Sequence, residues 1–290
     1  MLATSAADAF DRFERAKNDG LLVRGVHRKE EAGRQFRDIL GVLGDEICSP
    51  SDCPGQIMPP WLAHAAFRLF ARQSFEGAKA WGSQFYAELK RLNGTVPFSV
   101  VYDWHANVVA PFVIRFSQRP EPNPWSNVAP PTAMQALHGR AFGGDTIAAA
   151  EWHRVLYDAF LHIFADRMTV NLNNIDLNNM GRQQDMAKFF HGPRLAEANA
   201  RAYGGAFASA DAVGYARANA EPTSVGFGLD CYAEAAVTAY SILSVHAKFL
   251  AYKGTSPPYD YYNGIKSKNE RIGFAALAQG LLQCLTRVGQ

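Results

Sequence analysis

Three side chains suited to acid-base or metal chemistry recur at four-residue intervals near the middle of the chain: Asp158, His162 and Asp166. On a helix, residues four apart share a face, so the three could hold a metal ion or act as a base with its orienting carboxylate. A solvated row of charges opposite an apolar stripe has the same spacing. Since no HExxH or ExxH pattern supplies further ligands, this row supports a hydrolase only as an alternative prediction.

Two other acids are candidates for catalysis. Asp103 and His105 are two residues apart in VYDWHANVV, so their side chains point apart on a helix and a catalytic pair would need a third partner. Glu76 in QSFEGAK resembles the single acid of a lysozyme-like site. The chain contains no nucleophile elbow, Walker loop or dinucleotide fingerprint. We therefore assign no catalytic residue, cofactor or metal, and keep a hydrolase acting through Glu76 or the 158–166 row as the alternative.

Residues 257–271, PPYDYYNGIKSKNER, combine aromatic rings with positive charge. Three tyrosines surround Asp260, an Asn-Gly pair predicts a turn, and three cations follow within seven residues of Gly264. Rings stack on bases at about 1 to 3 kcal/mol each and cations neutralise phosphates, so the composition favours single-stranded RNA. The alternative is that the tyrosines pack a turn against the core while Asp260 caps it or pairs with a buried arginine.

YDYYNGI, residues 259–265, resembles a signature of the coat proteins of flexible filamentous plant viruses of the potexvirus type. HRVLYDAFLHIFADRMTVN, residues 153–171, is similar to the arginine-bearing core helix of that family. The resemblance implies a helical fold, also similar to phlebovirus nucleoproteins, that wraps single-stranded RNA between lobes and contacts neighbouring subunits through its arms. It further implies a structural salt bridge between Asp260 and Arg154.

These patterns predict a coat or nucleocapsid protein that polymerises along single-stranded RNA without sequence preference. An interaction-only role, such as an effector or scaffold, is a third possibility. The basic stretch near residues 24–37 is also typical of a solvated helix face. The predicted RNA contacts are Arg24, Arg28, Lys29, Arg154, Arg182, Lys188, Tyr261, Tyr262, Lys266, Lys268 and Arg271.

Composition places the chain among ordinary folded proteins. Of its 290 residues, 48% are hydrophobic and 19% charged, with a net charge of +2. Four scattered cysteines do not form a disulfide framework, and the N-terminus lacks the pattern of a secretory signal, so we expect reduced thiols and a cytoplasmic protein. The longest uncharged apolar run, near residues 235–245, is shorter than a membrane span requires.

Hydrophobic spacing predicts a mainly α fold in three parts. Residues 1–55 are expected to form a basic helical arm and a proline-rich linker, 56–250 a helical core, and 251–290 a C-terminal extension. Residues 96–116 suit either a buried helix or a pair of strands. The helices are expected near 1–47, 61–92 (two helices, or one kinked at Gly77), 145–168, 185–203, 232–250 and 267–285, the last starting with a Ser267/Glu270 capping box.

Overall fold

A computed structural model describes residues 1–117, 128–173, 182–220, 232–234, 236–237, 241 and 259–290. Within these ranges, the structure describes every side chain except those of residues 116–117, 163–173, 182–192, 220, 259–263 and 265. The predicted mainly α class is confirmed. The elements are α1 (Ala6–Asn18), β1 (Arg28–Glu31), β2 (Arg34–Arg37), η1 (Gly41–Leu43), η2 (Pro50–Asp52), α2 (Pro60–Arg72), α3 (Phe75–Arg91), α4 (Ser99–Trp104), η3 (His105–Val109), α5 (Ala110–Ser117), α6 (Ala129–Phe142), α7 (Ala149–Asn173), α8 (Arg182–Ser209), α9 (Ala212–Ala220) and α11 (Tyr259–Arg287).

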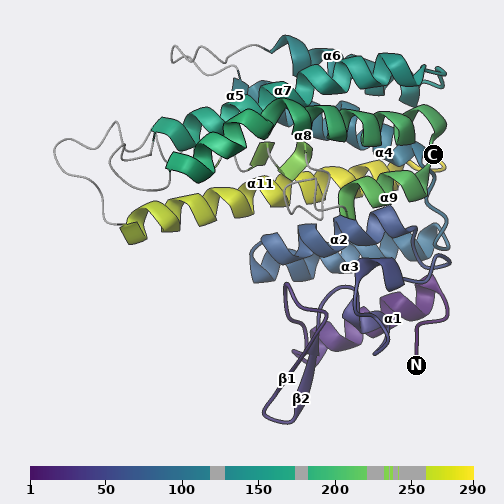
Figure 1. Cartoon of the computed structure of the whole chain (residues 1–290). Helices are drawn as coiled ribbons and strands as arrows, with labels where there is room; N and C mark the ends of the chain where they lie inside the picture. The colour runs from purple at the N-terminus through teal and green to yellow at the C-terminus, as the bar shows by residue number, and fades with distance from the viewer. Residues whose placement is uncertain (118–127, 174–181, 221–231, 235, 238–240, 242–258) are drawn as a thin grey trace.

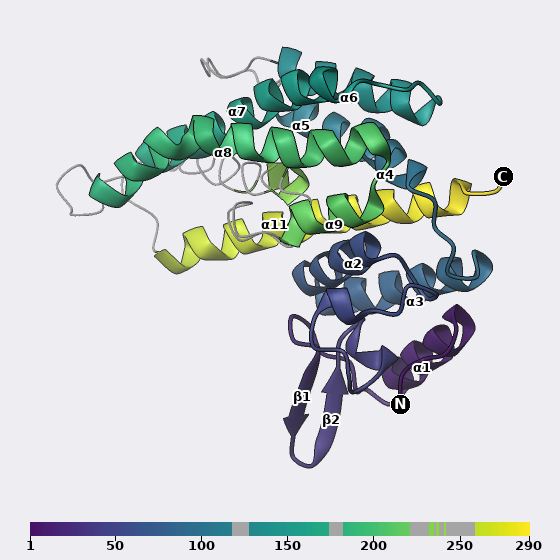
Figure 2. The same cartoon turned by 45° about the vertical axis from the view of Figure 1, so that its right-hand side comes forward.

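Helix α11 runs through the middle of the molecule, with α1, α2 and α3 on one side and α5 to α8 on the other (Figures 1 and 2). Two indole N–H groups donate to its backbone: Trp81 to the Ala278 carbonyl at 2.9 Å and Trp104 to the Leu277 carbonyl at 3.1 Å. Leu277 and Leu281 on α11 are fully buried. The C-terminal helix therefore forms part of the core between the two groups of helices.

The N-terminal region differs from the predicted run of helix. Helix α1 is confirmed, but β1 and β2 form an antiparallel hairpin in which Arg28 pairs with Arg37 and Glu31 with Arg34. Ala32 and Gly33 link the strands with φ of 50° and 71°, and two left-handed residues make the tight turn that suits a two-residue hairpin. The helix predicted through this stretch is therefore wrong.

Residues 48–60 do not behave as the predicted linker. Ile57 and Met58 are fully buried, and Cys53 is almost so, in the same hydrophobic core as α1 and α2. Pro60 occupies the first turn of α2, where its missing N–H has no intrahelical partner to lose. Residues 1–55 thus pack onto the helical body.

Several helix limits also differ from expectation. The break between α2 and α3 lies at Gln73 and Ser74, where the Ser74 hydroxyl accepts from the Gly77 N–H at 3.1 Å. Residues 96–116, left open between helix and strands, are helical from Ser99 onward and include one π turn, η3.

The predicted 145–168 helix corresponds to α7, and the 185–203 helix lies within α8. The expected Asn-Gly turn and the Ser267 capping box are wrong, because both lie inside α11. Most of the predicted 232–250 helix falls outside the described residues.

Candidate functional site

An exposed aromatic ring flanked by cations lies at the corner between α2 and α3. The Arg24 guanidinium lies 5.8 Å from the centroid of the Phe75 ring, and the Lys79 ammonium lies 4.9 Å from it. Arg24 also donates to the Gln73 carbonyl oxygen, which holds it at this corner. Phe75 is 39% exposed, so part of its ring stays open to solvent. We call Arg24, Arg72, Phe75, Lys79 and Arg271 the Phe75 patch.

Two arginines of the Phe75 patch repel each other. Burial, and then the positive charge of Arg271, lower the pKa of Arg24 below its usual value. No ion pair joins Arg24 or Arg271 to a carboxylate within the described part of the chain. Like charges held together without a counter-charge raise the energy of the unliganded protein, and an anion placed between them would lower it.

The other two cations of the patch have acidic partners. Lys79 lies 2.7 Å from Glu76, three residues earlier on α3, and Arg72 lies 3.5 Å from Glu270 on α11. Arg72 also lies over the Phe274 ring at 5.1 Å. The uncompensated charge of the patch is therefore that of Arg24 and Arg271.

The structure brings some predicted RNA contacts together and separates others. Arg24 and Arg271 are close enough for the charge of Arg271 to lower the pKa of Arg24, and the exposed Lys268 lies one turn before Arg271 on α11. Lys266 is half-buried on the same helix. Sequence reasoning missed Phe75, although Phe75 and Lys79 are four residues apart in one helical segment.

The remaining predicted contacts lie elsewhere. Arg28 and Lys29 lie on β1, which is on the opposite side of α11 from α7 and its exposed Arg154 (Figures 1 and 2). Arg182 and Lys188 lie on α8, and Tyr261 and Tyr262 lie on α11. The side chains of all four are outside the part of the chain that the structure describes. The Asp260 side chain is also outside it, so its salt bridge with Arg154 stays a prediction.

The candidate residues of the hydrolase alternative lie in different environments. Asp158 is exposed, whereas His162 is 9% exposed and burial lowers its pKa; the Asp166 side chain lies outside the described ones. Glu76 has an 80% exposed side chain paired with Lys79, so water surrounds it. Among the described residues, no three His, Cys, Asp or Glu side chains gather closely enough to hold a metal ion.

Asp103 has a partner that its sequence context does not reveal. Its carboxylate is almost fully buried and accepts three hydrogen bonds from Arg287, at 2.7, 2.8 and 3.0 Å. The Asn107 amide adds a fourth at 2.7 Å. Arg287 also donates to the Cys284 sulfur at 3.2 Å, and burial above all raises the pKa of that thiol to about 12. This cluster clamps α4 to α11 and engages both carboxylate oxygens of Asp103.

His105 packs against a second histidine instead of Asp103. Its ring stacks on that of His138 at 4.4 Å and 14°, and its Nδ1 lies 2.8 Å from the Val101 carbonyl oxygen. His138 is fully buried beside Trp152 and Phe207, and neither of its ring nitrogens has a hydrogen-bond partner among the residues that the structure describes. Burial, and then His105, hold the pKa of His138 well below 6.5. His138 is thus a neutral residue of the core.

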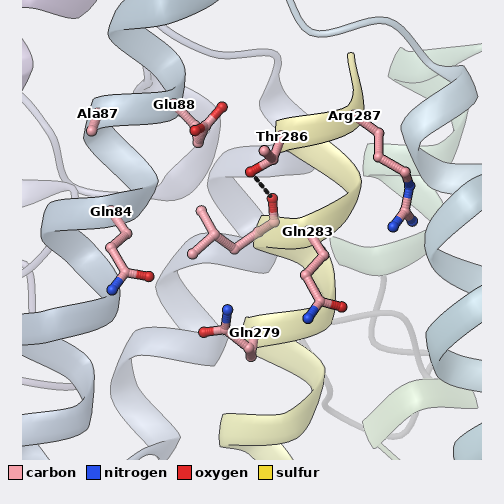
Figure 3. Close-up of a pocket in the computed structure, with 8 residues that line it drawn as sticks. Gln84, Ala87, Glu88, Gln279, Gln283, Thr286 and Arg287 are labelled. Carbon is pink, nitrogen blue, oxygen red and sulfur yellow. Dashed lines mark hydrogen bonds between the residues drawn. The ribbon is translucent and has the colours of Figure 1, made fainter. Parts of the chain in front are cut away.

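A polar hollow of about 490 Å³ lies between α3 and α11 (Figure 3). Amides of Gln84, Gln279 and Gln283 line it together with Thr286, whose hydroxyl donates to the Leu282 carbonyl at 3.0 Å. Glu88 and Arg287 also line the hollow, so its walls combine hydrogen-bonding amides with one acidic and one basic side chain.

Comparisons with protein-family models, with curated proteins and with solved structures find no match to this chain. Within the described residues, no helix has both the length and the apolar character needed to cross a membrane.

Proposed function

We propose that this protein binds single-stranded RNA without sequence preference and coats it as a homo-oligomer in the cytoplasm, with no cofactor. The observation that carries the proposal is the open ring of Phe75 with the cations of Arg24 and Lys79 beside it, together with the positive charge of Arg271 that acts on Arg24. A phosphate between the guanidiniums would relieve their repulsion, and a base could stack on the ring. Such contacts do not discriminate between the four bases, so binding would have no sequence preference.

Single-stranded RNA suits the patch because it offers phosphates and unstacked bases within a few ångströms of each other. A double helix hides its bases, and a free phosphate would use the arginines but not Phe75. The coat-like assembly rests on the sequence resemblance alone and needs a test of its own. The hydrolase alternative is less well supported, because Glu76 is exposed, and Asp158 is exposed whereas His162 is buried.

The test is fluorescence anisotropy of a labelled single-stranded RNA homopolymer titrated with the protein at several salt concentrations. The logarithm of affinity should fall linearly with the logarithm of salt concentration, with a slope of about 0.7 for each phosphate contacted. Arg24→Gln with Arg271→Gln removes the one phosphate contact proposed between them, so it should weaken binding and lower that slope by about 0.7. Arg201→Gln is the matched control, since Arg201 is a 78% exposed arginine on α8.

Phe75→Leu separates stacking from charge. It keeps apolar bulk and both arginines but removes the ring, so affinity should fall about 5- to 150-fold with the salt slope unchanged. U-, C- and A-homopolymers should bind within an order of magnitude of one another, and negative-stain images with RNA should show assemblies. A flat salt profile, or equal losses in the control and the double variant, would contradict the proposal.

A further inference from the structure

The outer edge of strand β1 is unpaired. The sheet has two strands, and β2 is covered on its far side, where the Arg37 N–H donates to the Leu21 carbonyl and the Val23 N–H donates to the Arg37 carbonyl, both at 2.9 Å. No segment of the described chain covers β1 in this way, and all four of its residues are exposed. An exposed strand edge is a template for pairing with another strand.

The hydrogen-bond pattern identifies the backbone groups that face outward. In an antiparallel pair, successive residues point their N–H and C=O alternately toward the partner strand and away from it. The Asp38 N–H donates to the His27 carbonyl at 3.3 Å, so His27 points inward and the alternation puts Lys29 and Glu31 with it. Arg28 and Glu30 therefore direct their backbone N–H and C=O groups to the open edge.

This alternation of inward- and outward-facing residues limits how the β1 strand of a second copy can pair. Residues that point outward must lie opposite one another, so Arg28 can face Arg28 or Glu30 of another copy, and Glu30 can face Glu30 or Arg28. Only the register centred on Lys29 puts Arg28 opposite Glu30 twice. Moving it by two residues in either direction would oppose two arginines or two glutamates, and like charges directly opposite are destabilising.

The charges of the strand suit this register. Glu30 has no ion pair within the described chain, and Arg28 reaches Asp45 only at 3.8 Å while Asp45 lies 2.7 Å from Arg37. Both charges are thus free to bind a partner. Lys29 would face its own copy across the axis, but each Lys29 ammonium lies 2.7 Å from Glu31 of the same strand, which offsets the repulsion.

We propose that a second copy of this chain docks at the open edge of β1, antiparallel and two-fold symmetric about Lys29, to give a four-stranded sheet across the dimer. Each Arg28 then faces Glu30 of the other copy, and the outward backbone groups of both strands pair. In an isologous contact of this kind both copies use the same surface, so the contact joins two chains and leaves no edge free for a third. It supplies one self-association surface for the proposed coat, but needs no RNA, so a filament would require a second contact.

The test is sedimentation velocity of the RNA-free full chain across a concentration series. Wild type should show a monomer–dimer equilibrium. Glu30→Arg and Arg28→Glu should each raise the dimer dissociation constant about tenfold or more, because each replaces two attractive contacts with repulsive ones. The combined swap, Arg28→Glu with Glu30→Arg, recreates opposite charges at both positions and should restore dimerisation.

Glu30→Pro compared with Glu30→Ala tests the backbone contribution, because both variants lose the charge that faces Arg28 and only proline also loses the N–H. The proline variant removes an N–H that points away from β2, so the hairpin keeps its own bonds while the dimer loses two. A wild-type protein that is monomeric throughout, or a swap that stays as weak as the single variants, would overturn the proposal. Because RNA is absent from these measurements, failure of the dimer leaves the Phe75 patch untouched, and failure of RNA binding leaves the dimer untouched.

Discussion

Replacing His138 with phenylalanine is expected to stabilise the protein and to reduce its sensitivity to acid. The imidazole is fully buried between His105, Trp152 and Phe207, and neither nitrogen has a hydrogen-bond partner in the described part of the chain. A phenyl ring has a similar planar shape and no polar atom to leave unsatisfied. Removing two unsatisfied nitrogens should raise the free energy of unfolding by about 1 to 3 kcal/mol at neutral pH.

The acid response follows from the direction of the pKa shift. The pKa of His138 lies well below 6.5 in the folded protein, so the unfolded chain binds a proton that the folded chain does not. Stability is therefore full above pH 6.5 and falls as the pH drops, by up to about 1.4 kcal/mol per pH unit for this group. Burial also lowers the pKa of His64 and His162, so the wild type should lose stability more steeply than one histidine allows.

Urea unfolding followed by circular dichroism between pH 5 and 7.5 measures both effects. The His138→Phe variant should gain stability at every pH, and its advantage should grow by about 1.4 kcal/mol for each pH unit below 6.5. Tyr102→Phe is the matched control, since its hydroxyl donates to the Phe207 carbonyl at 2.6 Å in the same cluster but carries no charge at these pH values. A His138→Phe variant whose acid slope equals that of the control would refute the reasoning.

Two further outcomes are expected. Arg287→Met should lower the free energy of unfolding by about 3 kcal/mol, because it leaves the buried Asp103 carboxylate without its cation. The double variant with Asp103→Asn removes that unpaired charge and should recover part of the loss. Thermal or urea unfolding measures both changes. Cys48 is exposed, whereas burial raises the pKa of Cys53 to about 12. Iodoacetamide should therefore alkylate Cys48 in the native protein and react with Cys53 only after the protein unfolds. Peptide mass mapping of the alkylated protein measures the difference.

The helices with a clear apolar stripe could be predicted from the sequence. Trp152, Leu156 and Phe160 recur at four-residue spacing, and all three are buried along α7 as that spacing predicts. The segment at 96–116 could not be resolved in advance, because its valines and aromatics suit a buried helix and a strand equally well. The hairpin was missed because its turn is Ala32-Gly33 rather than the Asn-Gly or Asp-Gly pair that marks such turns.

The candidate surface was only partly predictable for a different reason. Arg24 and Arg271 were both chosen for their charge, but they lie near opposite ends of the chain, and local patterns carry no information on which distant residues meet. The same limit applies to Asp103 and to His105, whose partners Arg287 and His138 come from other helices. Long-range pairing of this kind is set by packing rather than by local propensity.

The position of α11 has a consequence for biosynthesis. Trp81 and Trp104 hydrogen-bond to its backbone, and Arg91 donates to its Leu285 carbonyl at 2.8 Å, so the two groups of helices share a centre that is translated after both of them. A nascent chain that has emerged only as far as α9 exposes the apolar surface that α11 covers. During that interval chaperones have an obvious substrate, and prematurely terminated products should be cleared by proteases rather than accumulate.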